Sequence, residues 1–170
     1  MAGVTVVGRP LKTPEAIIAK LVRERGRLNR IQDIAGARIV VPNLEAQEAV
    51  LRVVLDEFLD GEATIVKDAR AEGDELGYRG VHVVVLIEGR YAEIQIRTGL
   101  QGLWAQIVER LDEDQGTDLK HGSGPEATLK WLKEFSQRLT SVEYGDKADV
   151  RTMLETALAI FLVRPKDTDE

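Results

Sequence analysis

Two neighbouring stretches in the middle of the chain have the hydrophobic pattern of paired β-strands. Residues 81–87 are almost wholly apolar, which predicts a central strand that is buried on both faces. In residues 90–97 polar and apolar side chains alternate, which predicts a strand with one core face and one polar face. Glu88 and Gly89 lie between these stretches and favour a tight turn, so the sequence predicts a β-hairpin.

A two-residue turn also sets the register of this hairpin. Counting back from the turn places Val84 opposite Glu93 and His82 opposite Gln95. Residues that lie opposite each other in an antiparallel pair share a face, so these four side chains are expected on one face of the sheet. The polar face of the hairpin is therefore the first candidate for a functional site.

The rest of the pattern predicts helices together with further strands. Segments rich in β-branched residues predict strands at residues 36–41 and 63–67. Apolar residues three or four apart predict helices at residues 14–25, 44–59 and 100–111, and C-terminal helices within residues 124–163. Thr13 and Asn43 are expected to cap the first two helices. The polar residues 112–123 contain turn-forming glycines and are expected to form a mobile loop.

Length and composition indicate one domain. The chain has 170 residues, of which 44% are hydrophobic, enough for one core and too few for two comfortable domains. No apolar run approaches the roughly 20 residues that span a bilayer, and the N-terminus lacks the pattern of a secretory signal. We therefore expect residues 1–170 to form a single cytoplasmic domain that does not bind a membrane.

Residue types also limit the chemistry. The absence of cysteine excludes disulfides, thiolate metal sites and a cysteine nucleophile. Two histidines are too few for a histidine-rich metal site. Any metal ion in this chain must therefore be held by carboxylates.

Charge is distributed unevenly along the chain. The net charge is −6, yet residues 9–38 hold eight basic against three acidic side chains, which makes this segment +5 and the remainder −11. A basic segment in an acidic protein suits a compact polyanion such as a nucleoside triphosphate better than a long nucleic acid. The alternative for each of these residues is a solvated, arginine-rich helix face.

Three segments, in order, resemble the signature stretches of the RelA/SpoT synthetase family. They are residues 33–39 (DIAGARI), residues 77–82 (GYRGVH) and residues 93–98 (EIQIRT), the last followed by residues 103–105 (LWA). The basic residues 9–13 (RPLKT), with Lys20, look like the ATP-side element of that family. The resemblance covers residues 8–112, and three motifs in register over a strand, turn, strand and helix pattern make it specific.

This resemblance implies a fold, a reaction and a cofactor. The fold class is α+β, a nucleotidyltransferase-like mixed β-sheet of about five strands flanked by helices. The reaction is the transfer of pyrophosphate from ATP to the 3′-hydroxyl of GDP or GTP, which makes (p)ppGpp. The cofactor is Mg²⁺, and such a transfer does need a hard cation and fixed cationic groups around the phosphate oxygens.

The resemblance also assigns roles to residues. Asp33 and Glu93 are the expected catalytic residues and Mg²⁺ ligands, and Glu93 is in addition a candidate to deprotonate the attacking hydroxyl. The expected ATP-binding residues are Arg9, Lys12, Lys20 and Arg38. The expected acceptor-binding residues are Tyr78, Arg79, His82 and Gln95, of which Tyr78 offers a ring for base stacking. Trp104 lies in an apolar stripe and is expected in the core.

Some positions depart from the family pattern and leave the acceptor open. The family often has a Pro-Lys pair before its Gly-Tyr element, where this chain has residues 72–76 (EGDEL), and Lys67 or Arg70 is a candidate to replace the missing charge. Gly80 stands where a serine is common. The alternatives are therefore an adenine nucleotide or the 3′ end of tRNA as acceptor, as in toxic family members, or a nucleotide-binding protein without catalysis.

Partners other than substrates are also left open by the sequence. The apolar stripe within residues 153–162 either closes the core or faces a second copy of the chain, so a homo-oligomer through the C-terminal helices is one expectation. A neutralising antitoxin is another open possibility, whereas the acidic surface argues against tRNA as a partner.

Overall fold

The computed structural model describes residues 3–8, 11–25, 27–58, 63–71, 73–146 and 150–162. The chain divides into two units. The sheet unit comprises Met1–Asp68 and Gly80–Thr98, and the helical unit comprises Ala69–Arg79 and Gly99–Glu170. The expectation of one domain stays a prediction, and the two units are described separately.

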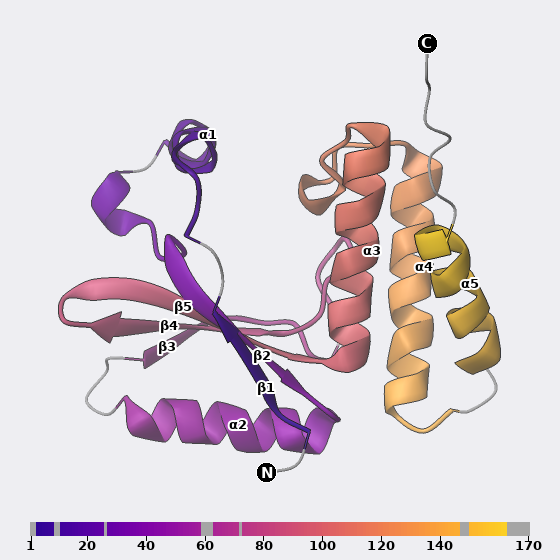
Figure 1. Ribbon diagram of the computed structural model, residues 1–170, viewed down its shortest axis with the longest axis horizontal. Coiled ribbons are helices and arrows are strands. Elements are labelled where there is room, and N and C mark those ends of the chain that lie inside the picture. The colour runs from indigo at the N-terminus through magenta and orange to yellow at the C-terminus, as the bar shows by residue number, and fades with distance from the viewer. Residues whose placement is uncertain are drawn as a thin grey trace. The chain divides into compact units, whose positions relative to one another are not determined.

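A five-stranded mixed sheet forms the centre of the sheet unit (Figure 1). Its strands are β1 (Thr5–Gly8), β2 (Ala35–Val41), β3 (Ala63–Asp68), β4 (Val81–Ile87) and β5 (Arg90–Thr98). Their order in the sheet is β1-β2-β5-β4-β3, and β2 with β5 is the parallel pair. The predicted α+β class with a mixed sheet of about five strands is confirmed, and β1 is the strand that the pattern alone does not predict.

The hairpin of β4 and β5 has the predicted register. Val84 lies opposite Glu93 and His82 lies opposite Gln95. Glu88 adopts a left-handed conformation with φ of 50°, and Gly89 follows with φ of 74°, as a tight two-residue turn requires. The turn chemistry and the alternation along β5 together specify which side chains share a face.

Helix α2 (Leu44–Glu57) covers one face of this sheet, and Asn43 caps it by accepting a hydrogen bond from the backbone of Ala46 at 2.8 Å. The core of the sheet unit lies between α2 and the sheet and contains Val41, Val50, Leu51, Val54, Val81, Val83, Val85 and Ile96. Because side chains alternate along a strand, Glu93 and Gln95 belong to the opposite face of the sheet. That opposite face is the polar face.

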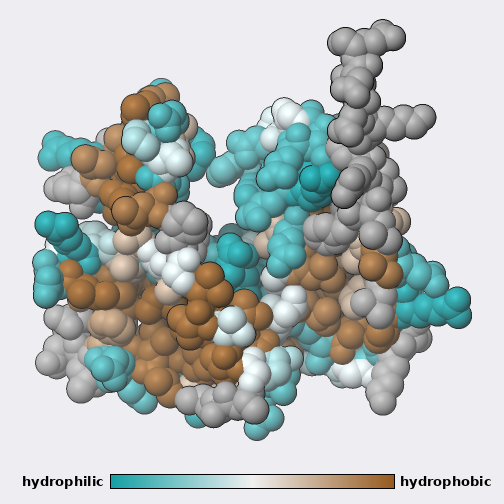
Figure 2. Space-filling model, in the orientation of Figure 1, coloured by the Kyte–Doolittle hydropathy of each residue, from teal (hydrophilic) through white to brown (hydrophobic). Residues whose placement is uncertain are grey.

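Helix α1 (Pro14–Glu24) and the short 3₁₀ helix η1 (Leu28–Arg30) belong to the same unit. Figure 1 shows α1 on the side of the sheet away from α2, which is the side of the polar face. Thr13 caps α1 as predicted. Ile18 and Val22 of α1 are exposed apolar residues. Figure 2 shows hydrophobic surface, in brown, over this helix.

The helical unit contains α3 (Gly99–Gln115), the 3₁₀ helix η2 (Leu119–His121), α4 (Glu126–Glu143) and α5 (Val150–Leu162). Its core includes Trp104, Ile107, Val108, Leu119, Leu132, Phe135, Leu139, Met153 and Ala157. Trp104 is 4% exposed, and its indole nitrogen donates to the carbonyl of Leu132 at 3.0 Å. Its predicted place in the core is confirmed.

The prediction of a loop over residues 112–123 is wrong for most of that segment. Helix α3 continues to Gln115, and η2 occupies part of the remainder. The reason is the carboxylate of Asp112, which accepts hydrogen bonds from the Thr117 hydroxyl at 3.0 Å and the Leu119 backbone at 2.7 Å. These bonds satisfy backbone and side-chain donors just beyond the helix end, so the polar segment folds into an ordered turn.

Helix α5 carries the apolar stripe that was expected to close the core or to face a second copy. Met153 and Ala157 lie in the core of the helical unit, whereas Leu158 is 54% exposed. The side chains of Leu154, Phe161 and Leu162 lie outside the described part of the structure. A homo-oligomer through this helix stays a prediction. Among the described residues, no helix has the length and apolar character needed to cross a membrane.

Candidate active site

A row of hydrogen-bonded polar side chains runs along the polar face of β5. One carboxylate oxygen of Glu93 lies 2.6 Å from Nδ1 of His82, and the other accepts from the Gln95 amide at 2.7 Å. The Gln95 carbonyl oxygen in turn accepts from Arg97 at 2.8 Å. As a whole residue Glu93 is only 8% exposed, and each of its carboxylate oxygens has a hydrogen-bond partner.

The predicted residues Glu93, His82 and Gln95 are thus brought together, and Arg97 joins them. Arg97 is not among the predicted site residues, although its place in the alternation of β5 puts it on the same face as Glu93. A guanidinium that holds the Gln95 side chain fixes the amide for its bond to Glu93. The alternation is therefore the signal that could have found it.

The neighbouring strand β2 brings Arg38 to this row. In the parallel pairing Arg38 lies beside Gln95, and Gly36 lies beside Glu93. A Cβ atom at Gly36 would lie 2.2 Å from the backbone oxygen of Glu93. This distance is too short for two non-bonded atoms, so any residue with a side chain would clash here. The glycine of the DIAGARI segment therefore permits β2 to approach β5 at the level of Glu93.

A second cluster in the sheet unit surrounds Asp33, two residues before β2. The ammonium group of Lys20 donates to one Asp33 oxygen at 2.8 Å, and that of Lys12 donates to the other. Burial alone would raise the pKa of Asp33, but the hydrogen bonds and charges of Lys12 and Lys20 outweigh it and hold that pKa below its ordinary value. Asp33 is therefore a stable anion.

Three residues with separately predicted roles thus contact one another. Lys12 and Lys20 are the expected ligands of ATP phosphates, and Asp33 is the expected ligand of Mg²⁺. A bound nucleotide and metal ion would compete with these ion pairs for the same groups. Arg9, which is also an expected ligand of the ATP phosphates, lies outside the described residues.

The carboxylates suit Mg²⁺ in ligand chemistry, since this ion binds oxygen and uses one or two carboxylates together with substrate phosphates and water. The part of the chain that the structure describes contains no cluster of three acidic or histidine side chains arranged to hold a metal ion. Asp33 would have to release a lysine, and Glu93 would have to share an oxygen that now contacts His82 or Gln95. The residues therefore fit a metal ion that arrives with a phosphate, and do not form a cage for an ion alone.

Tyr78 and Arg79, two further predicted acceptor ligands, belong to the helical unit. The ring of Tyr78 meets that of Trp104 edge to face, with ring centres 6.1 Å apart. Arg79 is 4% exposed and donates to the Thr140 hydroxyl and the Arg70 carbonyl. These contacts hold Arg79 within the helical unit, and its role as an acceptor ligand stays a prediction.

The segment that departs from the family pattern shapes the loop before Tyr78. The carboxylate of Asp74 accepts hydrogen bonds from the backbone of Leu76 at 3.0 Å and of Tyr78 at 2.8 Å. Gly77 between them has φ of 92°, and its carbonyl accepts from the Ser136 hydroxyl on α4 at 2.5 Å. Asp74 therefore orders this loop, a role that aspartate commonly has in turns.

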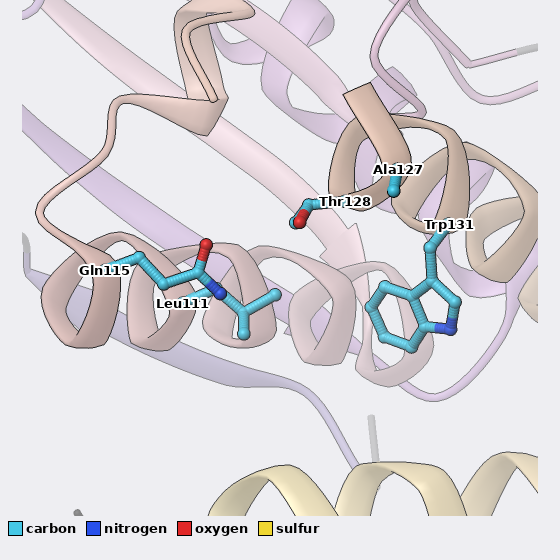
Figure 3. A pocket seen from close by; sticks show the side chains of 5 residues that line it. All are labelled: Leu111, Gln115, Ala127, Thr128 and Trp131. Carbon is cyan, nitrogen blue, oxygen red and sulfur yellow. The ribbon is translucent and has the colours of Figure 1, made fainter. Parts of the chain in front are cut away.

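A pocket of about 360 Å³ lies between α3 and α4 of the helical unit (Figure 3). Its lining residues are Leu111, Gln115, Ala127, Thr128 and Trp131. The lining is mainly apolar, and none of the predicted site residues contributes to it. The pocket therefore does not belong to the candidate site, whose hydrogen-bonded polar side chains lie on the polar face of the sheet unit.

Comparison with known proteins agrees with this fold. A family model described as "Region found in RelA / SpoT proteins" matches residues 8–112, and the chain belongs to this family. The uncharacterised protein Rv1366 of Mycobacterium tuberculosis is 35% identical over 116 residues, which cover 68% of this chain and 42% of that protein. The chain thus spans less than half the length of that relative.

Two further matches, a curated protein and a solved structure, both from Bacillus subtilis, are similar over more of their length. The GTP pyrophosphokinase YjbM is 29% identical over 178 aligned positions, which cover 97% of this chain and 80% of YjbM. The crystal structure of the small alarmone synthetase 1, bound to its product pppGpp, superposes with a TM-score of 0.66 and 26% identity. That superposition covers 88% of this chain and 78% of the other.

Proposed function

We propose that this chain is an ATP:nucleotide 3′-pyrophosphokinase that transfers pyrophosphate from ATP to the 3′-hydroxyl of GDP or GTP. The observation that carries the proposal is the carboxylate of Glu93, which is held between His82 and Gln95 on the polar face. Membership of the RelA/SpoT family and the likeness to a GTP pyrophosphokinase and to a synthetase bound to pppGpp support this reaction.

Glu93 is the proposed general base. The 3′-oxygen of the acceptor forms a bond to the β-phosphorus of ATP while the bond from that phosphorus to the α,β-bridging oxygen breaks, and AMP leaves. The proton of the hydroxyl passes to Glu93. His82 and Gln95 orient the carboxylate, because each contacts a different oxygen. His82 is assigned the tautomer with a proton on Nδ1. In this tautomer Nδ1 donates a hydrogen bond to the Glu93 carboxylate.

Lys12, Lys20 and Arg38 are the proposed ligands of the ATP phosphates. Transfer of a lysine from Asp33 to a phosphate exchanges one anionic partner for another, so the ammonium group keeps a negative neighbour throughout. The same exchange would free an oxygen of Asp33, and this carboxylate would then hold Mg²⁺, which would supply charge neutralisation at the phosphate oxygens. ATP and the metal ion are therefore expected to bind together.

The proposal is tested by offering the purified protein γ-labelled ATP and Mg²⁺ with one acceptor at a time. We expect the label to move to GDP and GTP, to 2′-deoxy-GDP, and not to 3′-deoxy-GDP, because the last lacks the attacking hydroxyl. Label on an adenine nucleotide or on tRNA would instead support the alternative acceptors. Binding of nucleotides without any transfer would identify a protein that lacks catalysis.

A further inference from the structure

One face of helix α4 carries polar side chains that bind the loop between β3 and β4. Ser136, Thr140 and Glu143 follow one another at helical spacing, so they lie along one face of α4. Ser136 is 4% exposed, and its hydroxyl donates to the carbonyl of Gly77 at 2.5 Å. The Thr140 hydroxyl accepts from Arg79, whose guanidinium also lies 4.0 Å from a carboxylate oxygen of Glu143. Helix α4 therefore holds the last residues of this loop.

The backbone of the loop approaches α4 closely at Gly77. A Cβ atom at this position would lie 3.0 Å from the Cβ atom of Ser136 and 3.2 Å from the Cα atom of Lys133. Both distances are tighter than ordinary van der Waals contact, and Gly77 also has φ of 92°, which glycine adopts without strain. A residue with a side chain at this position would thus push the loop away from α4.

Tyr78 lies between the two residues that α4 holds, and it has contacts of its own. Its ring meets that of Trp104 edge to face, and the indole nitrogen of Trp104 donates to the Leu132 carbonyl on α4 at 3.0 Å. The backbone of Tyr78 donates to the Asp74 carboxylate at 2.8 Å. Tyr78 is nevertheless only half-buried, so these contacts fix the residue without enclosing it.

The fixed position of Tyr78 has a consequence for binding. A side chain that is ordered before its ligand arrives loses less conformational entropy when the ligand binds. The loop that ends at Arg79 leads into β4, the strand that carries His82, and His82 contacts the proposed base Glu93. The side chains of α4 therefore influence how Tyr78 is presented to a ligand.

We propose that Ser136 and Thr140 are positioning residues for the acceptor nucleotide, because they hold the residues on either side of Tyr78. The base of the acceptor stacks on the Tyr78 ring, and the two hydroxyls of α4 keep that ring in place before the base arrives. This inference rests on the proposed function and on the base-stacking role predicted for Tyr78. Helix α4 lies beyond residues 8–112, so the family's signature motifs do not include these positioning residues.

The first test compares Ser136→Ala with Ser141→Ala, a control in the same helix whose hydroxyl donates to the Gln137 carbonyl at 3.3 Å. We expect Ser136→Ala to raise the KM for GDP by about fivefold, the scale of one lost hydrogen bond. The KM for ATP and the kcat at saturating GDP should stay close to wild type, because neither ATP nor Glu93 is held by this contact. Ser141→Ala should have wild-type values throughout.

A conservative pair at Thr140 repeats the comparison. Thr140→Val keeps the shape of the side chain and removes the hydroxyl that accepts from Arg79, so it should also raise the KM for GDP by about fivefold. Thr140→Ser keeps the hydroxyl and should recover most of the loss. This pair carries the test if Ser136→Ala does not fold.

A double variant separates positioning from packing. Tyr78→Ala alone should raise the KM for GDP by about tenfold, within the range of one lost base stack. If Ser136 acts through Tyr78, adding Ser136→Ala to Tyr78→Ala should raise that KM no further. A contact that served packing alone would lower the free energy of unfolding without this dependence on the tyrosine.

Other results would overturn this inference. These are equal KM values for GDP in Ser136→Ala and Ser141→Ala, equal values in the Thr140 pair, or an unchanged value in Tyr78→Ala. A further fivefold increase in the double variant, or an equal rise in the KM for ATP, would also contradict it. Each of these outcomes leaves the proposed function intact, since pyrophosphate is still transferred. Absence of transfer by the wild type to every acceptor would overturn the proposed function and this inference with it.

Discussion

The surroundings of Asp33 and those of Glu93 differ in the charge of the groups that bind each carboxylate. The two side chains are similarly exposed, 16% for Asp33 and 11% for Glu93, so burial does not distinguish them. Both oxygens of Asp33 contact ammonium groups, from Lys12 and Lys20. Those of Glu93 contact an imidazole and a neutral amide, from His82 and Gln95.

This difference in partners suits the two carboxylates to different chemical functions. A carboxylate held by two cations, with its pKa lowered as that of Asp33 is, resists protonation and suits electrostatic partnership with cations or a metal ion. A carboxylate oriented by an imidazole and an amide suits a group that accepts a proton and passes it on. Sequence motifs alone treat Asp33 and Glu93 as a pair, whereas the charge of their partners distinguishes the two carboxylates.

Loss of the Glu93 carboxylate is expected to have the largest effect on turnover. Glu93→Gln keeps the shape and the polar face but removes the proton acceptor, so turnover should fall by about 10² or more. Nucleotide binding, measured by calorimetry, should change little. Glu48→Gln is the matched control, because the side chain of Glu48 on α2 of the same unit is 43% exposed, and this variant should keep wild-type turnover. Wild-type turnover in a folded Glu93→Gln protein would remove the general base.

A smaller effect is expected from the lysines of the Asp33 cluster. Lys12→Met or Lys20→Met should raise the KM for ATP by about tenfold, because each removes one charge-assisted contact to a phosphate. The KM for the acceptor should not change. Lys130→Met on the exposed surface of α4 is the control for loss of a positive charge. If all three variants have the same KM for ATP, the Asp33 cluster has no part in nucleotide binding.

The smallest effect concerns stability and its dependence on pH. The pKa of Asp33 is lowered in the folded chain, so its ion pairs stabilise the fold above the unfolded pKa, and this contribution is lost as the pH falls through the lowered value. Asp33→Asn should therefore lower the free energy of urea unfolding by roughly 1 kcal/mol at neutral pH. The difference from wild type should shrink below about pH 4. A difference that stays constant down to acid pH would show that the ion pairs do not contribute.

Much of the sheet unit could be predicted from local sequence. The hairpin register followed from a two-residue turn and an alternating strand, and Asn43 marked the start of α2. Strand β1 could not be predicted in this way. It has four residues, all exposed, and as an edge strand it has no alternation between core and solvent.

The contacts that define the site depend on residues far apart in the sequence. The sequence shows several basic residues near Asp33, but only the fold selects Lys12 and Lys20 from among them. The pairing of Lys67 with His82 depends on a register shift in β3, which exists only in relation to the partner strand β4. Arg79 lies in a signature segment, yet its contacts with Thr140 and the Arg70 carbonyl bury it in the helical unit.

In the proposed reaction pyrophosphate, and not a single phosphate, moves from ATP to the acceptor nucleotide. The most direct measurement counts AMP and labelled product together when the wild-type protein reacts with γ-labelled ATP and GDP. Pyrophosphate transfer predicts equimolar AMP and labelled guanosine product, with no ADP formed. ADP in amounts equal to the labelled product, or ATP consumed without any labelled nucleotide, would contradict it.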